Sequence, residues 1–202
     1  NSKGFPTNAV LGFTTMLRKL LREHAPRYAG VAFDLAEPTF RHKAYADYKA
    51  NRPEAPPDLV AQIPAVRKVC EVLGVASLDL PGYEADDLIG TLARRGSEAG
   101  FEVVIVTTDK DLLQLVGDRV RILNPKTEEF LDASGVERAF GVKPSQVRDV
   151  LALWGDASDN IPGVPGIGEK GAKKLIREFG DLEKVLAAAP TLKSGIQREG
   201  LE

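Results

Sequence analysis

The stretch Gly82-Tyr83-Glu84-Ala85-Asp86-Asp87 places three carboxylates within four residues, directly before an apolar run with helical spacing. Pro81 and Gly82 indicate a turn, and a helix is predicted from Glu84 to about Glu98. Acidic residues in a first helical turn have an ordinary explanation, because the helix dipole favours negative charge there by about 0.3–1 kcal/mol each. Repulsion between crowded carboxylates, about 1–4 kcal/mol per pair at about 4 Å, exceeds that gain and would be relieved by a divalent cation.

Composition and charge are those of an ordinary globular chain, with 202 residues, 43% of them apolar and 28% charged. No apolar run is long enough to cross a membrane and no signal peptide is visible, so a cytoplasmic protein is expected. The single cysteine, Cys70, excludes an internal disulfide, and its apolar helical surroundings favour a buried thiol. The formal net charge of −2 argues against nucleic-acid binding, but basic residues gather in the first quarter of the chain.

Apolar periodicity predicts an alternation of strands and helices along the chain. Strands are expected at 30–34, 75–80, 101–107 and 120–123, with a hairpin arm at 126–131. Helices are expected at 8–24 with Asn8 as the cap, at 58–73 with a break at Pro64, and at 132–140, 144–153 and 181–189. The stretch 101–107 is nearly all apolar, as a parallel strand buried on both faces should be. The alternation predicts an α/β fold with a doubly wound, mostly parallel sheet.

Acidic residues stand at the ends of four predicted elements. They are Asp34; Glu84, Asp86 and Asp87; Asp109 and Asp111; and Asp156 and Asp159. The carboxyl ends of parallel strands converge on one crevice, so these carboxylates are expected to meet there. An all-oxygen set suits Mg²⁺ or Mn²⁺ rather than zinc, and two such ions about 3.5–4 Å apart can hydrolyse a phosphodiester. Each pair alone also has a structural explanation, since Asp111 could cap a helix that starts at Leu112.

Two further segments have the composition of nucleic-acid contacts. Gly166 and Gly168 form a turn before a basic helix with Lys170, Lys173 and Lys174. Glycine turns let backbone N–H groups approach phosphate, and lysines add charge that ignores base sequence. With Ile161-Pro162-Gly163-Val164-Pro165 before it, this looks like a DNA-binding helix-hairpin-helix; the alternative is a flexible turn with a solvated helix face.

The second segment, residues 40–52, combines aromatic and cationic side chains. Its members include Phe40, Arg41, Tyr48, Lys49 and Arg52. Single-stranded nucleic acids are bound by this mixture, through base stacking and phosphate contacts. The alternative is a mobile, solvated loop.

Five motifs, in this order, closely resemble the 5′ nuclease (flap endonuclease) domain of bacterial DNA polymerase I. They are Phe40-Arg41 with Tyr48-Lys49-x-x-Arg52, Gly82 to Asp87, Thr108-Asp109-Lys110-Asp111, Gly155-Asp156-x-Ser158-Asp159-Asn160 and Gly166-Ile167-Gly168-Glu169-Lys170. The resemblance covers nearly the whole chain and implies a PIN-like fold with a helical arch. It implies cleavage of 5′ flaps and 5′ ends of DNA, and of RNA primers, with two Mg²⁺ or Mn²⁺ ions. The expected domains are a nuclease core at 1–143, with the arch at about 40–57, and a helix-hairpin-helix subdomain at 144–202.

The resemblance also implies roles for individual residues. Asp34, Glu84, Asp86 and Asp87 would hold the first metal, and Asp109, Asp111, Asp156 and Asp159 the second. Arg41, Lys49 and Arg52 would be catalytic residues of the arch, with Lys49 and Arg52 at the scissile phosphate and Tyr48 stacked on a base. Residues Gly166 to Lys174, including Lys170 and Lys173, would grip duplex DNA with a K⁺ ion at the turn.

The family begins with a strand that carries another metal-ligand aspartate, and that strand precedes the first residue of this sequence. A fragment is therefore expected, and an alternative function is a catalytically inactive module that binds branched or nicked duplexes. A phosphatase or nucleotidase of similar build is less favoured, because it would not need the hairpin turn or the cation–aromatic segment. The expected partner is DNA with a 5′ flap, nick or branch, bound by a monomer at the bacterial nucleoid, with a polymerase domain following in the chain.

Overall fold

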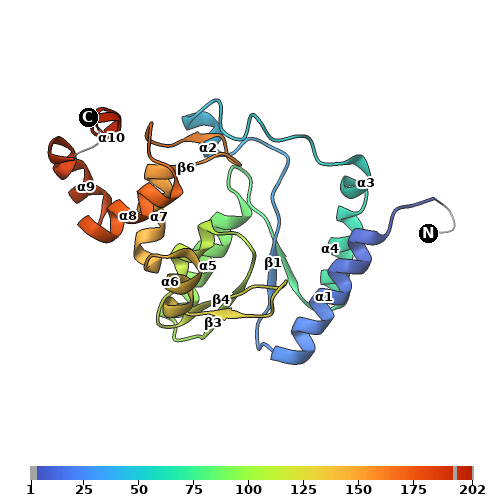
Figure 1. Ribbon diagram of the computed structural model, residues 1–202. Coiled ribbons are helices and arrows are strands. Elements are labelled where there is room, and N and C mark those ends of the chain that lie inside the picture. Colours follow the sequence, from blue (N-terminus) through green and yellow to red (C-terminus); the bar gives the residue numbers. More distant parts are fainter. Residues whose placement is uncertain (1–3, 193–194, 202) are drawn as a thin grey trace. The chain divides into compact units, whose positions relative to one another are not determined.

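The computed structural model describes residues 4–192 and 195–201 and divides the chain into two compact units, which can be followed by colour in Figure 1. The first unit contains residues 1–40 and 53–89, and the second contains residues 41–52 and 90–202. None of the helices in the described part of the chain is long and apolar enough to cross a membrane. The division of the domains at 143 and 144 stays a prediction.

The first unit is built on one parallel strand pair. Its elements are α1 (Asn8–His24), β1 (Gly30–Ala32), α3 (Pro57–Val60), α4 (Ile63–Val72), β2 (Ala76–Leu78) and the first turn of α5 (Ala85–Glu98). β1 and β2 are parallel, with Gly30 opposite Ala76, and α4 packs against both α1 and β2. Parallel strands need such helical crossovers, as the predicted α/β class requires.

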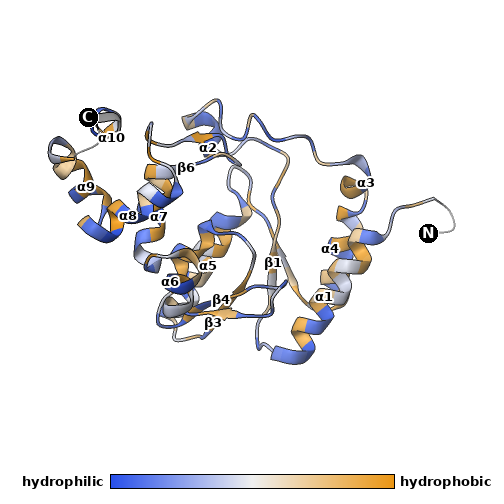
Figure 2. Ribbon diagram, viewed as in Figure 1, coloured by the Kyte–Doolittle hydropathy of each residue, from blue (hydrophilic) through white to orange (hydrophobic). Residues whose placement is uncertain are grey.

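The core of this unit lies where α1 meets α4. Leu17, Cys70 and Val75 form its buried centre, and Cys70 is fully buried as a free thiol, which confirms the predicted burial. In Figure 2, α1, α4 and α5 each carry both hydrophobic and hydrophilic bands, as expected for helices with one buried face. The predicted break at Pro64 is also confirmed, because α3 ends at Val60 and α4 begins with Pro64 in its first turn.

The N-terminus of α1 is capped from a distant part of the chain. Asn8 was expected to cap it, but Thr7 occupies the cap position without a side-chain bond. The Oε1 atom of Gln62 accepts the backbone N–H groups of Ala9 at 2.9 Å and Val10 at 3.2 Å. The Oδ1 atom of Asn8 instead accepts a hydrogen bond from Gln62 Nε2 at 3.1 Å. The cap prediction was therefore wrong, because a buried side chain satisfies the helix end.

The second unit contains the remaining elements. They are α2 (Phe40–Ala44, from Arg41 onward), the rest of α5, β3 (Val103–Val106), η1 (Asp111–Leu115), β4 (Val120–Leu123), β5 (Phe130–Leu131), α6 (Ala133–Phe140), α7 (Pro144–Trp154), β6 (Gly155–Asp156), β7 (Ile161–Pro162), α8 (Glu169–Phe179), α9 (Leu182–Ala188), η2 (Ala189–Thr191) and α10 (Gly195–Leu201). β3 pairs in parallel with β4, and β5 returns antiparallel to β4. α7 packs against η1, α8 and α9 and buries Val147, Val150 and Leu153 completely.

Two helices of this unit begin at aspartate caps. Asp132 Oδ1 accepts the Gly135 N–H at 2.7 Å at the start of α6, and Asp181 Oδ1 accepts the Lys184 N–H at 2.9 Å at the start of α9. The hydrogen bond from Gly135 lowers the pKa of Asp132 below its ordinary value, since it stabilises the ionised carboxylate. Both helices were predicted, and each starts one residue after its acid.

β3 is buried on one face rather than on two. Ile105 is buried, whereas Val104 is 40% and Val106 is 39% exposed. Among the described strands, β3 is hydrogen-bonded only to β4 and therefore lies at an edge of its sheet. The prediction of a strand buried on both faces was wrong for this reason. β1 is half-buried, and its paired residues end at Ala32, two positions before Asp34 and short of the predicted end at residue 34.

The hairpin of β6 and β7 depends on two glycines. A Cβ atom at Gly163 would overlap the backbone of Trp154, and one at Gly155 would overlap the backbone of Gly163. Gly155 also has a φ of +80°, which favours glycine. The two backbones therefore approach closely, and this approach positions the residues between the two glycines, 156–162, which include the acidic loop 156–160.

The segment 40–57 is more ordered than a solvated loop. It begins with α2, and Tyr48 is buried at 6% exposure. The alternative of a solvated loop therefore does not hold at Tyr48. Its ring packs edge-on against His42, with the ring centroids 5.2 Å apart.

Candidate active site

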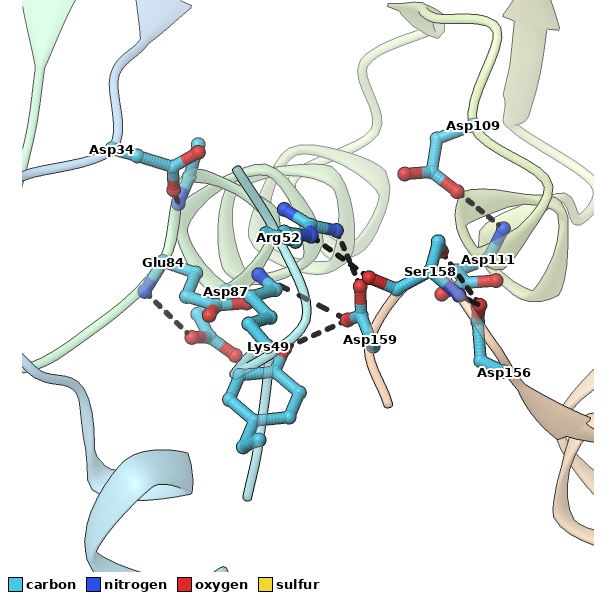
Figure 3. A network of polar contacts seen from close by, with 12 residues as sticks. Asp34, Lys49, Arg52, Glu84, Asp87, Asp109, Asp111, Asp156, Ser158 and Asp159 are labelled. Atoms are coloured by element: carbon cyan, nitrogen blue, oxygen red, sulfur yellow. Dashed lines mark hydrogen bonds and ion pairs between the residues drawn. The ribbon is translucent and has the colours of Figure 1, made fainter. Parts of the chain in front are cut away.

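The first group of acids surrounds the N-terminus of α5 in the first unit. Asp34 Oδ1 accepts the Ala85 N–H at 2.8 Å, and Asp87 Oδ2 accepts the Glu84 N–H at 2.9 Å (Figure 3). Glu84 is 7% exposed, and Asp86 lies in the same first turn. The structure thus brings Asp34 and Asp87 to one helix end, where they satisfy N–H groups that a helix leaves unpaired.

The second group begins at the end of β3 in the second unit. Asp109 Oδ1 accepts the Asp111 N–H at 2.8 Å, and Asp111 is the first residue of the short η1 helix, whose cap position is Lys110, rather than its cap. Asp111 Oδ1 is buried and accepts no hydrogen bond from any described residue. Lys110 Nζ forms an ion pair with this oxygen at 3.6 Å, which is too long for a hydrogen bond. A buried carboxylate oxygen without a hydrogen bond suits a position that a cation is to occupy.

Lys110 bridges this group to Asp156 at the end of β6. Its Nζ atom lies 2.7 Å from Asp156 Oδ2 and 3.6 Å from Asp111 Oδ1. Burial by itself raises the pKa of Asp156, but hydrogen bonds from Lys110 and Ser158 outweigh burial and hold that pKa at about 2. The Lys110 ammonium therefore serves as a counter-charge built into the site.

Negative charge nevertheless remains in excess around Asp111. Burial, followed by the nearby carboxylate of Asp109, raises the pKa of Asp111, and Lys110 only partly opposes this. Asp156 and Asp159 raise that pKa further. Four carboxylates thus act on one another electrostatically within this unit. They are the four that the family resemblance assigns to one metal ion, and that assignment stays a prediction.

The donor set fits a hard divalent cation by its chemistry. The site acids offer only carboxylate oxygens, and one of these oxygens, on Asp111, is buried without a hydrogen-bond donor. Within residues 4–192 and 195–201, the structure contains no group of three His, Cys, Asp or Glu side chains close enough together to hold a metal ion. The convergence of all four acid groups on one pocket stays a prediction.

Asp159 is held by the predicted arch residues, all within the second unit. Tyr48 Oη donates to Asp159 Oδ2 at 2.9 Å, Arg52 forms a short ion pair with Asp159 Oδ1, and Lys49 Nζ lies 3.9 Å from Asp159 Oδ2 (Figure 3). Two predicted phosphate-binding cations therefore lie against a predicted metal ligand. Arg41 is half-buried in α2.

Tyr48 does not present its ring for stacking. The side chain is buried, its edge contact with His42 and the Lys49 ammonium 4.9 Å from its centroid surround the ring, and its hydroxyl is bonded to Asp159. Stacking on a base would require the ring to leave this position. That role stays a prediction, and the structure instead shows a support for Asp159.

Models of two protein-family domains match the whole chain. One, described as the 5′-3′ exonuclease N-terminal resolvase-like domain, matches residues 1–141, and the other, the 5′-3′ exonuclease C-terminal SAM fold, matches residues 142–202. The chain belongs to the 5′-3′ exonuclease family. This finding confirms the resemblance and the α/β fold class with a helical C-terminal part.

Curated relatives of this exonuclease-family chain are longer than the chain itself. It is 46% identical to a 5′-3′ exonuclease of Aquifex aeolicus over 185 residues, which is 92% of the chain and 64% of that relative. It is 44% identical to DNA polymerase I of Bacillus caldotenax, over 100% of the chain and 23% of that protein. The chain thus spans less than two thirds of the first relative and about a quarter of the second.

Solved structures share the fold of this exonuclease-family chain. A 5′-exonuclease of bacteriophage T5 with bound zinc superposes with a TM-score of 0.81 at 22% identity, covering 97% of this chain and 76% of that one. The catalytic core of Rad2 in complex with DNA substrate gives a TM-score of 0.62 at 19% identity, covering 100% and 66%. The predicted inactive alternative receives no support from these relatives.

The lysines of the helix-hairpin-helix segment are of two kinds, exposed to solvent or paired within the protein. Gly166 adopts a φ of +78° in the turn, and Gly168 is the cap residue of α8. Lys170 and Lys174 are exposed and lie one helical turn apart. Lys173 is bound within the protein, because it pairs with Glu169 and lies 4.1 Å from the centroid of the Phe140 ring.

Sequence reasoning missed three residues that build the site. Lys110 lies within the motif Thr108-Asp109-Lys110-Asp111, but its role as a counter-charge was not predicted. Asn51 and Asn160 were likewise not singled out as site residues, although both bond across the second unit. For Asn160 the residue type itself was a signal. Asparagine is enriched at positions with a positive backbone φ, and Asn160 has a φ of +57°.

Proposed function

We propose that this chain is the nuclease part of a 5′-3′ exonuclease or DNA polymerase I. It hydrolyses phosphodiesters at 5′ flaps and 5′ ends of DNA, and in RNA primers, in replication and repair. The observation that carries the proposal is the acid cluster around Lys110, which combines a buried carboxylate oxygen without a donor and an excess of negative charge. A protein that only bound DNA would gain nothing from carboxylates beside a phosphate.

Two divalent ions, Mg²⁺ or Mn²⁺, are proposed as cofactors. Asp34, Glu84, Asp86 and Asp87 would hold one ion, and Asp109, Asp111, Asp156 and Asp159 would hold the other. When bound, such ions lower the pKa of water and stabilise a leaving oxygen. The chain itself contributes oxygen donors of the type these ions prefer.

The cations of residues 49–52 are proposed to bind the scissile phosphate. Lys49 and Arg52 are held at the acidic loop, where they now neutralise Asp159. In the proposed complex, a substrate phosphate would pair with Lys49 and Arg52 while a metal ion binds the Asp159 carboxylate. Each charged group would therefore keep an oppositely charged partner. Arg41, in α2, is proposed to assist in the same segment.

The helix-hairpin-helix is proposed to hold the duplex through backbone N–H groups at Gly166 and Gly168 and through the exposed Lys170 and Lys174. K⁺ at the turn carbonyls belongs to the same proposal. We also propose that the protein acts as a monomer on nucleoid DNA and that a polymerase domain follows this region in the full-length protein.

Cleavage of a labelled 5′-flap duplex, with and without Mg²⁺, tests the proposal. Asp111→Asn should reduce cleavage by about 100-fold or more, because even the outer partners of metal ligands contribute about 10–100-fold. DNA affinity should be retained or increased, since a repulsive carboxylate is lost. Asp118→Asn is the matched control, because Asp118 is exposed in the turn before β4.

Three outcomes contradict the proposal or one of its parts. Flap binding without any cleavage at high metal concentration would identify a binding module. Cleavage of free nucleotides but not of the flap would identify a nucleotidase. If Asp111→Asn cuts at the parent rate, the assignment of the second metal set is wrong.

A further inference from the structure

Residues 47–52 and the loop 156–160 are joined by hydrogen bonds that do not depend on charge. Asn51 Nδ2 donates to the Ala157 carbonyl at 2.8 Å, and Asn160 Nδ2 donates to the Asp47 carbonyl at 2.7 Å. Each segment therefore contributes one asparagine to a backbone carbonyl of the other. We call Asn51 and Asn160 the asparagine clamp.

The clamp encloses a residue in an unfavourable backbone conformation. Lys49 has a φ of +57°, and its N–H donates to the Asp159 carbonyl at 2.9 Å. Such a conformation is uncommon for a residue other than glycine and persists where surrounding contacts impose it. The two asparagine bonds lie on either side of this contact in the sequence and supply that constraint.

The clamp also fixes the start of two long side chains. Lys49 and Arg52 flank Asn51, and both reach Asp159. A flexible cation loses conformational entropy when it must meet a phosphate, and this cost falls if its backbone is already in place. Fixing the backbone at Asn51 therefore favours the contact that catalysis needs.

The chemistry of the clamp suits a site where ion pairs are exchanged. The ion pairs of Asp159 must open when a metal ion or a phosphate takes one partner. Amide-to-carbonyl hydrogen bonds are neutral, so they have no reason to open at that step. The clamp can hold the segment while its charged side chains change partners.

We propose that Asn51 and Asn160 are positioning residues that hold Lys49 and Arg52 at the acidic loop. The effect of the clamp on cleavage rests on the proposed function, whereas its effect on the backbone of residues 47–52 does not. Two experiments separate these parts.

The first experiment is limited trypsin digestion of the whole chain without metal or DNA. Asn51→Ala and Asn160→Gly each remove one clamp bond, and glycine keeps the positive φ of residue 160 accessible. Cleavage after Lys49, measured relative to cleavage after the exposed Lys43, should increase about tenfold, as expected for the loss of about one hydrogen bond. Asn160→Asp, which keeps the shape but loses the donor, should behave in the same way as Asn160→Gly.

Asn124→Ala is the matched control, because Asn124 accepts hydrogen bonds only within its own turn before β5. It should leave the ratio of the two cleavages unchanged. An unchanged ratio in both Asn51→Ala and Asn160→Gly would overturn the proposal, whatever the activity of the protein.

The second experiment measures flap cleavage. Asn51→Ala should lower kcat about tenfold, or about 1.4 kcal/mol, with KM changed less than twofold. In a Lys49→Ala, Arg52→Ala background the same change should have no further effect, because there is nothing left to position. A full tenfold effect in that background would show a merely structural role and overturn the proposal. If the parent does not cleave, the proposed function fails, and the digestion alone decides the clamp.

Discussion

Gln62 should be one of the most sensitive positions for stability, although it lies in no motif. Its side chain is 1% exposed and makes four hydrogen bonds, to the N–H groups of Ala9 and Val10, to Asn8 Oδ1 and to the Asp58 carbonyl. Gln62→Met keeps the length of the side chain and removes all four. At about 0.5–1.5 kcal/mol per bond the loss would be about 2–6 kcal/mol. Water can reach part of the α1 end, so about 2–4 kcal/mol is expected, close to two helix caps.

Urea denaturation followed by circular dichroism measures this loss as a shift of the midpoint at unchanged m-value. Gln114→Met is the matched control, because Gln114 is exposed and donates one hydrogen bond, to the Asp111 carbonyl. The control should change the free energy of unfolding by less than about 0.5 kcal/mol, as surface substitutions do. The reasoning is refuted if Gln62→Met loses no more than the control.

Three other outcomes are expected. Lys174→Ala should reduce the slope of the salt dependence of duplex binding by about one unit. Lys173→Ala should reduce it by clearly less, because Lys173 is paired with Glu169 within the protein. Equal effects would show that Lys173 contacts the DNA. Gly163→Ala should destabilise the protein by about 3 kcal/mol or abolish its cooperative melting, because the new Cβ would overlap the backbone of Trp154. Gly168→Ala, whose Cβ meets open space, should have little effect. Similar melting temperatures for the two variants would contradict the close approach of residues 154 and 163. The hydrogen bonds at the start of α6 lower the pKa of Asp132, so its carboxylate should stabilise the fold above pH 3.8 and progressively less as the pH falls below 3.8. Asp132→Ala should therefore weaken the pH dependence of the unfolding free energy on the acid side. An unchanged pH dependence would argue against the cap.

Local patterns predicted the elements that depend on local causes. α1 was predicted to its last residue and α5 to within one, because apolar residues recur at helical spacing and Gly100, at a φ of +86°, follows the end of α5. The acids at element ends were also found, since strand ends and helix starts are readable along the chain. The family was identified from ordered motifs rather than from these patterns.

Contacts between distant residues were beyond the reach of spacing rules. Gln62 caps a helix that starts 54 positions earlier, at Asn8, and no periodicity relates the two. The resemblance implies that Tyr48 stacks on a base, and no local pattern indicates that its hydroxyl donates to Asp159, 111 positions later. The exposure of Val104 depends on the edge position of β3, and an apolar sequence alone cannot distinguish an edge from a centre.

Lys110 gives the acidic loop a counter-ion that is covalently part of the chain. The protein is therefore expected to reach its folded state without a bound divalent ion. Preparation of the protein in chelating buffers should accordingly leave its fold intact.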